Sequence, residues 1–195
     1  MTETIDSALC DRQLLGAALD DPDSWQTWFA ALRAAFGLEL SREHRRIFAA
    51  ISGGRAAPTK RVREFGCLVG RKGGKSRMAA AIACYIALFG RFKLARGEQG
   101  LVLVLAMSMD QAKVVFGYCY GFLASSPVLA REIESTTATE IRLKNASSSP
   151  RMRTASDRCA VERSAPAYST RSRIGETRSA PFPISKLTRP SSQAC

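Results

Sequence analysis

Residues 67–77 read CLVGRKGGKSR, in which a short apolar run leads into a glycine-rich turn and then into a lysine and a serine. A loop that binds phosphate needs glycines, so that successive backbone N–H groups can close around oxygen atoms. It also needs a lysine to reach the outer phosphates and a hydroxyl to ligate Mg²⁺. Residues 73–76 supply these groups in the required order. The spacing departs from the common G-x-x-x-x-G-K-[ST], because Val69 stands at the first glycine position and Gly70 comes one residue late.

The hydrophobic pattern on both sides of this loop predicts alternating strands and helices. The expected elements are strands at 63–70, 101–106 and 140–144 and helices at 76–89 and 108–123. The continuous apolar run at 101–106 is typical of a strand that is buried on both faces of a parallel sheet. This order of elements predicts right-handed crossovers and a doubly wound α/β sheet over residues 56–145.

A helical segment is expected before the sheet, over residues 1–55. Its predicted helices span 9–19, 22–36 and 41–51, with Ser41 as a cap and Gly53 as a terminator. Trp25 and Trp28 are three positions apart on an apolar helical face, which favours core packing over base stacking. His44 lies among charged residues and is expected on a solvated helix face.

Charge and cysteine content narrow the class of protein. The 195 residues carry a formal charge of +12, and no apolar run approaches the ~20 residues of a membrane span. The first residues lack the basic and apolar regions of a signal peptide, so we expect a cytoplasmic protein with reduced thiols. The six cysteines form no CxxC pair and there is one histidine, which disfavours a zinc site. Cys67 is expected to be a small buried apolar residue.

The composition changes at about residue 146. Residues 146–195 hold nine Lys and Arg against three Asp and Glu, together with eleven Ser and five Pro. No helical or strand period persists there, and such a segment buries too little apolar surface to offset its ordering entropy. We therefore expect a low-complexity, disordered C-terminal tail.

The loop and its surroundings resemble the large terminase subunits of tailed bacteriophages, whose deviant Walker A loop has the form Arg-Lys-x-Gly-Lys-Ser. The resemblance covers roughly residues 10–145 and implies a RecA-like P-loop NTPase domain, here with a partial parallel sheet. It implies ATP and Mg²⁺ as cofactors, with Arg71 and Lys75 as catalytic residues and Ser76 as the metal ligand. The residues that it implies for nucleotide binding are Gly70, Lys72, Gly73, Gly74, Lys75, Ser76 and Arg77. The implied partners are double-stranded viral DNA, the portal protein, the small terminase subunit and further copies of the chain, in the cytoplasm of a bacterial host.

Two parts of that family are missing from the sequence. ATP hydrolysis needs acidic residues for Mg²⁺ and for the attacking water, and the tail offers only Asp157, Glu162 and Glu176, none after an apolar run. The family's nuclease domain has no room here. We therefore expect weak nucleotide binding with little or no turnover.

A frameshift between about residues 145 and 158 is one explanation. Residues 168–178 have a possible codon set whose neighbouring frame reads Leu-Asp-Glu-Ile-Ala-Tyr-Trp-Arg-Asp-Glu, which resembles a terminase Walker B segment. In the same frame, 159–164 can hide Arg-Gly-Arg-Thr-Val and 182–186 can hide Pro-Asp-Ile-Glu. The alternative is a natural basic tail that binds DNA phosphates.

Two other functions remain open at this level. One is a different small P-loop ATPase or phosphotransferase, for which Glu98 and Asp110, on either side of the 101–106 strand, are candidate acids. The other is a basic DNA-binding protein in which Gly-Lys-Ser is accidental. A basic cluster ahead of the loop fits such a role, or simply solubility: Arg55, Lys60, Arg61 and Arg63.

Overall fold

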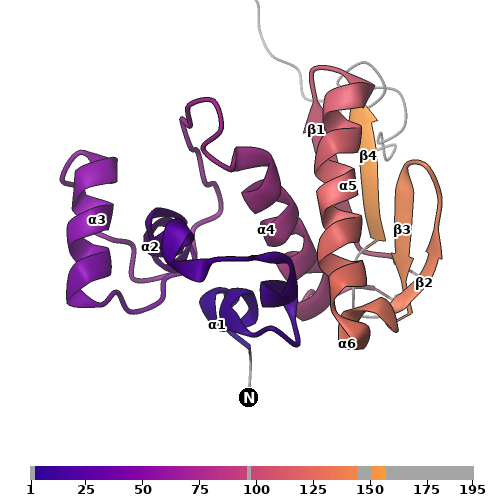
Figure 1. Cartoon of the computed structure of the whole chain (residues 1–195), viewed down its shortest axis with the longest axis horizontal. Helices are drawn as coiled ribbons and strands as arrows, with labels where there is room; N and C mark the ends of the chain where they lie inside the picture. The colour runs from indigo at the N-terminus through magenta and orange to yellow at the C-terminus, as the bar shows by residue number, and fades with distance from the viewer. Residues whose placement is uncertain (1–2, 96–97, 145–150, 157–195) are drawn as a thin grey trace, which may run out of the picture. The chain divides into compact units, whose positions relative to one another are not determined.

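The structure, a computed structural model, describes residues 3–95, 98–144 and 151–156, which lie within one compact unit of residues 1–164 (Figure 1). Its helices are α1 (Ile5–Cys10), η1 (Leu15–Ala18), η2 (Pro22–Trp25), α2 (Gln26–Ala35), α3 (Arg42–Ser52), α4 (Lys75–Phe89), α5 (Met109–Ser125) and α6 (Pro127–Ala130). Its strands are β1 (Leu101–Ala106), β2 (Ile133–Thr136), β3 (Glu140–Leu143) and β4 (Arg151–Ser156). Most of the expected tail lies outside the described residues, as does the proposed site of the frameshift apart from β4.

The prediction of a single helix over residues 9–19 is wrong. The chain instead forms two short helices, α1 and η1, that are separated by a turn at Asp11. The Asp11 carboxylate accepts a hydrogen bond from the Gln13 amide at 2.7 Å, and its carbonyl accepts from the Leu14 and Gly16 amides at 3.0 Å. A Cβ at Gly16 would lie 2.7 Å from that carbonyl oxygen, so the turn requires glycine. Local bonding to the backbone by an aspartate competes with helix continuation.

The next two predicted helices are confirmed as η2 followed by α2, and as α3. The Ser41 hydroxyl caps α3 by accepting from the His44 amide at 3.1 Å, and Gly53 ends it in the left-handed region at φ 68°. Asp21 caps η2, with Pro22 at its first position. These boundaries are set by local chemistry, which explains why the sequence shows them.

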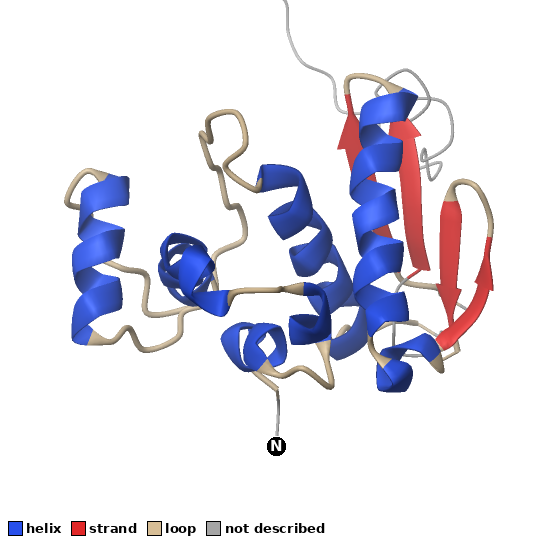
Figure 2. Cartoon of the chain, in the orientation of Figure 1, coloured by secondary structure: helices blue, strands red, loops and turns tan. Residues whose placement is uncertain are grey.

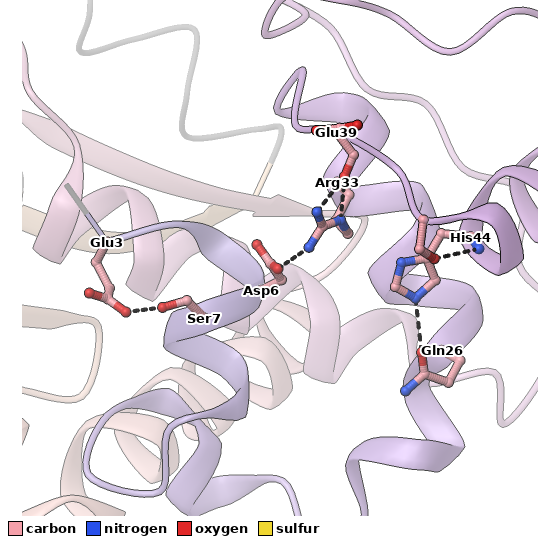
Figure 3. A network of polar contacts seen from close by, with 8 residues as sticks. Glu3, Asp6, Ser7, Gln26, Arg33, Glu39 and His44 are labelled. Carbon is pink, nitrogen blue, oxygen red and sulfur yellow. Dashed lines mark hydrogen bonds and ion pairs between the residues drawn. The ribbon is translucent and has the colours of Figure 1, made fainter. Parts of the chain in front are cut away.

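Polar contacts join these N-terminal helices (Figure 3). The Arg33 guanidinium pairs with the Asp6 carboxylate of α1 and donates to the Glu39 carbonyl through Nε at 2.9 Å. His44 is half-buried rather than solvated, and its Nε2 lies 2.9 Å from Oε1 of Gln26. The expectation of a solvated helix face is therefore wrong for His44, because α3 packs against α2 and the His44 ring contacts Gln26 of that helix.

The predicted helices after the loop and after β1 are confirmed as α4 and α5, and the two pack against each other. Small residues of α4 fill this contact, and Ala80, Ala83 and Cys84 are buried against Phe116, Cys119 and Leu123 of α5. Both helices also contact β1 and β4 (Figure 2). Burial of this apolar surface is the main stabilising term for the unit.

Four strands form a mixed sheet in the order β1-β4-β3-β2. β1 and β4 are parallel, with Leu101 opposite Arg151, while β4 and β3 and then β3 and β2 are antiparallel. The expected strand at 140–144 is confirmed as β3. β4 lies inside the expected low-complexity tail, so the expectation that no regular structure occurs there is wrong for residues 151–156.

The expectation that β1 is buried on both faces is also wrong. Its burial alternates, and Leu101, Leu103 and Leu105 are 50%, 39% and 49% exposed, while Val102 packs on the core. In the described part of the chain, α4 and α5 contact β1 and no helix is packed over the leucines. The apolar run at 101–106 therefore does not mean that both faces of β1 are buried in this structure.

No strand forms at the predicted position 63–70. Phe65, Cys67 and Leu68 are exposed, so the expected burial of Cys67 is wrong as well. A strand needs a neighbour that satisfies its backbone groups. In the described sheet, β1 pairs with β4, β4 pairs with β3, and β3 pairs with β2. None of these strands is hydrogen-bonded to residues 63–70.

Candidate phosphate-binding loop

Residues 70–74 form a turn that leads directly into α4. Gly74 adopts φ 75° and Lys72 adopts φ 62°, both in the left-handed region. The Gly73 amide donates to the Gly70 carbonyl at 3.4 Å, which closes the turn. A lysine in this conformation is disfavoured by about 1 kcal/mol, so the surrounding contacts must hold the turn in place.

The N-terminus of α4 has unsatisfied donors. Gly74 is its N-cap and supplies no side-chain cap, and the first bond within the helix runs from the Met78 amide to the Gly74 carbonyl at 2.9 Å. The N–H groups of residues 74–77 therefore lack acceptors within the helix. Together with the helix dipole, they favour an anion at this end.

The predicted site residues gather at this helix end. Lys75 is the first residue of α4 and is exposed, and Ser76 follows it and is half-buried. The exposed residues of the turn are Gly70, Arg71, Lys72 and Gly73. Residues 70–77 contain four cationic side chains and no acidic one, so the charge at the turn suits a polyanion.

Arg77 has partners other than the turn. Its guanidinium donates to the Ala18 carbonyl, lies 3.4 Å from Oδ2 of Asp20 and stands 5.6 Å from the centre of the Trp25 ring. These contacts tie the first turn of α4 to the chain between η1 and η2. The structure therefore gives Arg77 a contact with the helical segment, while the nucleotide contact stays a prediction.

Trp25 and Trp28 approach the turn directly, which the sequence analysis missed. The indole N–H of Trp28 donates to the Gly73 carbonyl at 2.9 Å. A Cβ at Gly74 would lie only 2.4 Å from Cζ3 of Trp25, so that ring packs on the glycine itself. Both rings also pack on the core, as predicted. The only signal in the sequence was their spacing, which does not show what they face.

An open groove of about 1050 Å³ adjoins the turn. Its walls include Trp25 and Trp28, the turn at Lys72–Gly74 and the apolar residues Phe48 and Leu68. The groove combines aromatic rings with a cationic rim. Sites for small molecules are commonly lined by apolar and aromatic side chains with a few polar or charged groups.

The residues fit a phosphate group well and a metal ion only in part. The described residues contain no cluster of three or more His, Cys, Asp or Glu that could hold a metal. The Ser76 hydroxyl is thus a single protein ligand, and Mg²⁺ at such sites takes most ligands from phosphate and water. Of the candidate acids, Glu98 accepts from the Ala95 amide at 2.8 Å, and Asp110 lies 3.9 Å from the Lys113 ammonium.

No family model, curated protein or solved structure matches this chain. Within the described ranges, every helix is too short or too polar to cross a lipid bilayer.

Proposed function

We propose that residues 70–76 bind the triphosphate of ATP. The observation that carries the proposal is the uncapped N-terminus of α4, whose free amides stand beside Lys75 and the cationic turn. In this arrangement the amides of residues 74–76 donate to phosphate oxygens, and Lys75 neutralises the outer phosphates. The Ser76 hydroxyl serves as the protein ligand of Mg²⁺, which shields phosphate charge when bound.

The resemblance to large terminase subunits extends this proposal to a motor. The chain would then be a RecA-like ATPase portion, with Arg71 and Lys75 stabilising charge on the transferred phosphoryl group. Its partners would be double-stranded viral DNA, a portal protein, a small terminase subunit and further copies of itself. The place of action would be the cytoplasm of a bacterial host.

Binding without turnover is the second part of the proposal. Hydrolysis needs a carboxylate near the attacking water. The two acids nearest β1 in sequence, Glu98 and Asp110, are engaged with an amide of their own turn and with a lysine of their own helix. We therefore expect the chain to retain ATP and to release phosphate no faster than buffer does.

Equilibrium dialysis with labelled ATP and Mg²⁺ tests binding. Lys75→Ala should weaken binding at least tenfold, which corresponds to the loss of one charge-assisted contact of about 1.5–3 kcal/mol. The matched control is Lys113→Ala, which removes an equally charged, exposed lysine from α5. Equal affinity in the wild type and Lys75→Ala would contradict the proposal. Mg²⁺-dependent phosphate release that is lost in Lys75→Ala would contradict the absence of turnover.

A basic DNA-binding protein is a second candidate, and one observation favours it. Arg55, Lys60 and Arg63 are exposed on the segment that joins α3 to the turn, so they add to the cations of the turn. Under this candidate, DNA binding falls steeply with salt and does not respond to ATP or to Lys75→Ala. Under the ATP-binding proposal, Lys75→Ala weakens nucleotide binding at least tenfold whether or not DNA is present.

A further inference from the structure

We infer that Trp25 and Trp28 are positioning residues, which hold the phosphate loop of residues 70–74 in its binding conformation through contacts from the N-terminal helical segment. This inference rests on the proposed function and adds to it a role for the N-terminal helical segment. Both residues come from one turn of chain at the junction of η2 and α2. Both meet the loop at its last two glycines, which lie 45 or more positions further along the sequence.

The Trp28 contact sets the orientation of one peptide group. Its indole N–H donates to the Gly73 carbonyl, so that carbonyl points toward α2. In a trans peptide the N–H points opposite to the C=O, and the chain has no cis peptide among its described residues. The Gly74 N–H therefore points away from Trp28. The bond thus directs the first of the free amides outward, where an anion can accept from it.

The Trp25 contact fixes the next residue. Its ring packs on Gly74 so closely that a Cβ there would approach two ring carbons to 2.4 and 2.7 Å. Gly74 is the residue whose φ of 75° turns the chain from the loop into α4. Without the ring, the glycine would be free to adopt many other conformations, because glycine has the widest choice of any residue.

Arg77 completes the attachment from the helix side. It lies over the Trp25 ring and donates to the Ala18 carbonyl, so the first turn of α4 is held by the same segment that holds the loop. A loop held in its binding conformation before the ligand arrives loses less entropy on binding. Removal of the Trp28 donor should therefore weaken phosphate binding, because the loop is then less firmly held before the ligand arrives.

The chain offers a direct readout, because these are its only two tryptophans. A proton–nitrogen NMR spectrum of the full chain should show two indole signals, assigned by the loss of one in each of Trp25→Phe and Trp28→Phe. Addition of ATP should shift the Trp28 indole signal in the wild type and should leave it in place in Lys75→Ala. An indole signal that does not move when ATP binds would show that occupation of the loop does not affect Trp28.

Affinity is measured on the same samples by dialysis. Trp28→Phe keeps the ring and removes the donor, so we expect about fivefold weaker ATP binding, which is the effect of one neutral hydrogen bond. Tyr118→Phe, an exposed hydroxyl deletion on α5, is the matched control and should change nothing. Suppose that the wild type binds ATP, that its Trp28 indole signal does not move, and that Trp28→Phe binds ATP with unchanged affinity. These results would overturn this inference and leave the proposed function standing. Failure of the wild type to retain ATP overturns the proposed function, and the inference with it.

Discussion

The thiol of Cys84 on α4 donates to the carbonyl of Cys119 on α5 at 3.5 Å, and the Cys119 thiol lies 3.9 Å from the carbonyl of Ala80. Both side chains are completely buried. The two sulfur atoms therefore lie in the contact between the helix that begins at the phosphate loop and the helix that follows β1. Because α4 carries the loop residues at its N-terminus, this contact helps to hold the candidate site.

Thiol reactivity should divide the four cysteines in the described part of the chain into two groups. Cys10 and Cys67 are exposed, whereas Cys84 and Cys119 are buried. Iodoacetamide should modify Cys10 and Cys67 in the native chain and reach Cys84 and Cys119 only after denaturation. Partial burial raises the pKa of the Cys10 and Cys67 thiols, so their alkylation should be slow near neutral pH and accelerate in mild alkali. Peptide mapping by mass spectrometry measures this, and native labelling of Cys84 would contradict the packing of α4 on α5.

Stability should fall in alkali because of Cys84. Burial raises the pKa of its thiol well above the ordinary value, and the nearby Cys119 adds to this. Above about pH 8.5 the unfolded chain releases a proton that the folded chain keeps, so the free energy of unfolding decreases with pH. Cys84 should add up to about 1.4 kcal/mol per pH unit to this decrease, and Cys84→Ala should make the slope shallower by that amount. Urea titrations of both proteins across this range measure the slopes, and parallel curves would refute the assignment.

The Arg33–Asp6 pair joins α2 to α1, and Arg33 also bonds to the Glu39 carbonyl. Both side chains are mostly shielded, since about a quarter of Arg33 and a fifth of Asp6 is exposed. Arg33→Ala should lower the free energy of unfolding by about 2 kcal/mol, because it leaves a carboxylate and a carbonyl unpaired. Arg46→Ala, on an exposed face of α3, is the control and should change it by less than about 0.5 kcal/mol. Equal effects of the two variants would show that the pair is unimportant.

Gly74 and Gly53 form a matched pair for testing the loop. Both have positive φ, at 75° and 68°, but a Cβ at Gly53 would meet nothing within 4 Å. Gly53→Ala should therefore lower the free energy of unfolding by about 1 kcal/mol, which is the cost of a positive φ for alanine. Gly74→Ala adds the clash with Trp25 and should cost about 2–3 kcal/mol and abolish ATP binding. If thermal unfolding shows the same loss for both, Trp25 does not pack on the loop.

The three exposed leucines of β1 should cause self-association. They lie on an uncovered face of a strand whose pairing in the described sheet is with β4 alone. Apolar faces and open strand edges promote aggregation. Leu103→Lys should reduce light scattering at high protein concentration, whereas Val128→Lys, at an exposed position on α6, should have little effect. Similar scattering in both variants would argue against association through β1.

What the sequence predicted well was set by neighbours along the chain. Ser41 and Gly53 mark the two ends of α3, because capping needs only residues three or four positions away. The turn that leads into α4 is local in the same way, while its binding of phosphate stays a prediction. The strand at 63–70 failed because pairing depends on a distant partner, which apolar residues such as Leu68 do not reveal. The contacts of Trp25 and Trp28 with the loop were missed for the same cause, since they span 45 or more positions.

In the proposed function, the turn before α4 binds phosphate through its backbone. Backbone amide shifts of the full chain, recorded while ATP and Mg²⁺ are added, test it most directly. If this turn binds phosphate, we expect saturable shifts at the amides of Gly73, Gly74, Lys75 and Ser76, and their absence in Lys75→Ala. Shifts confined to the basic residues between α3 and the turn, or none at all, would contradict it.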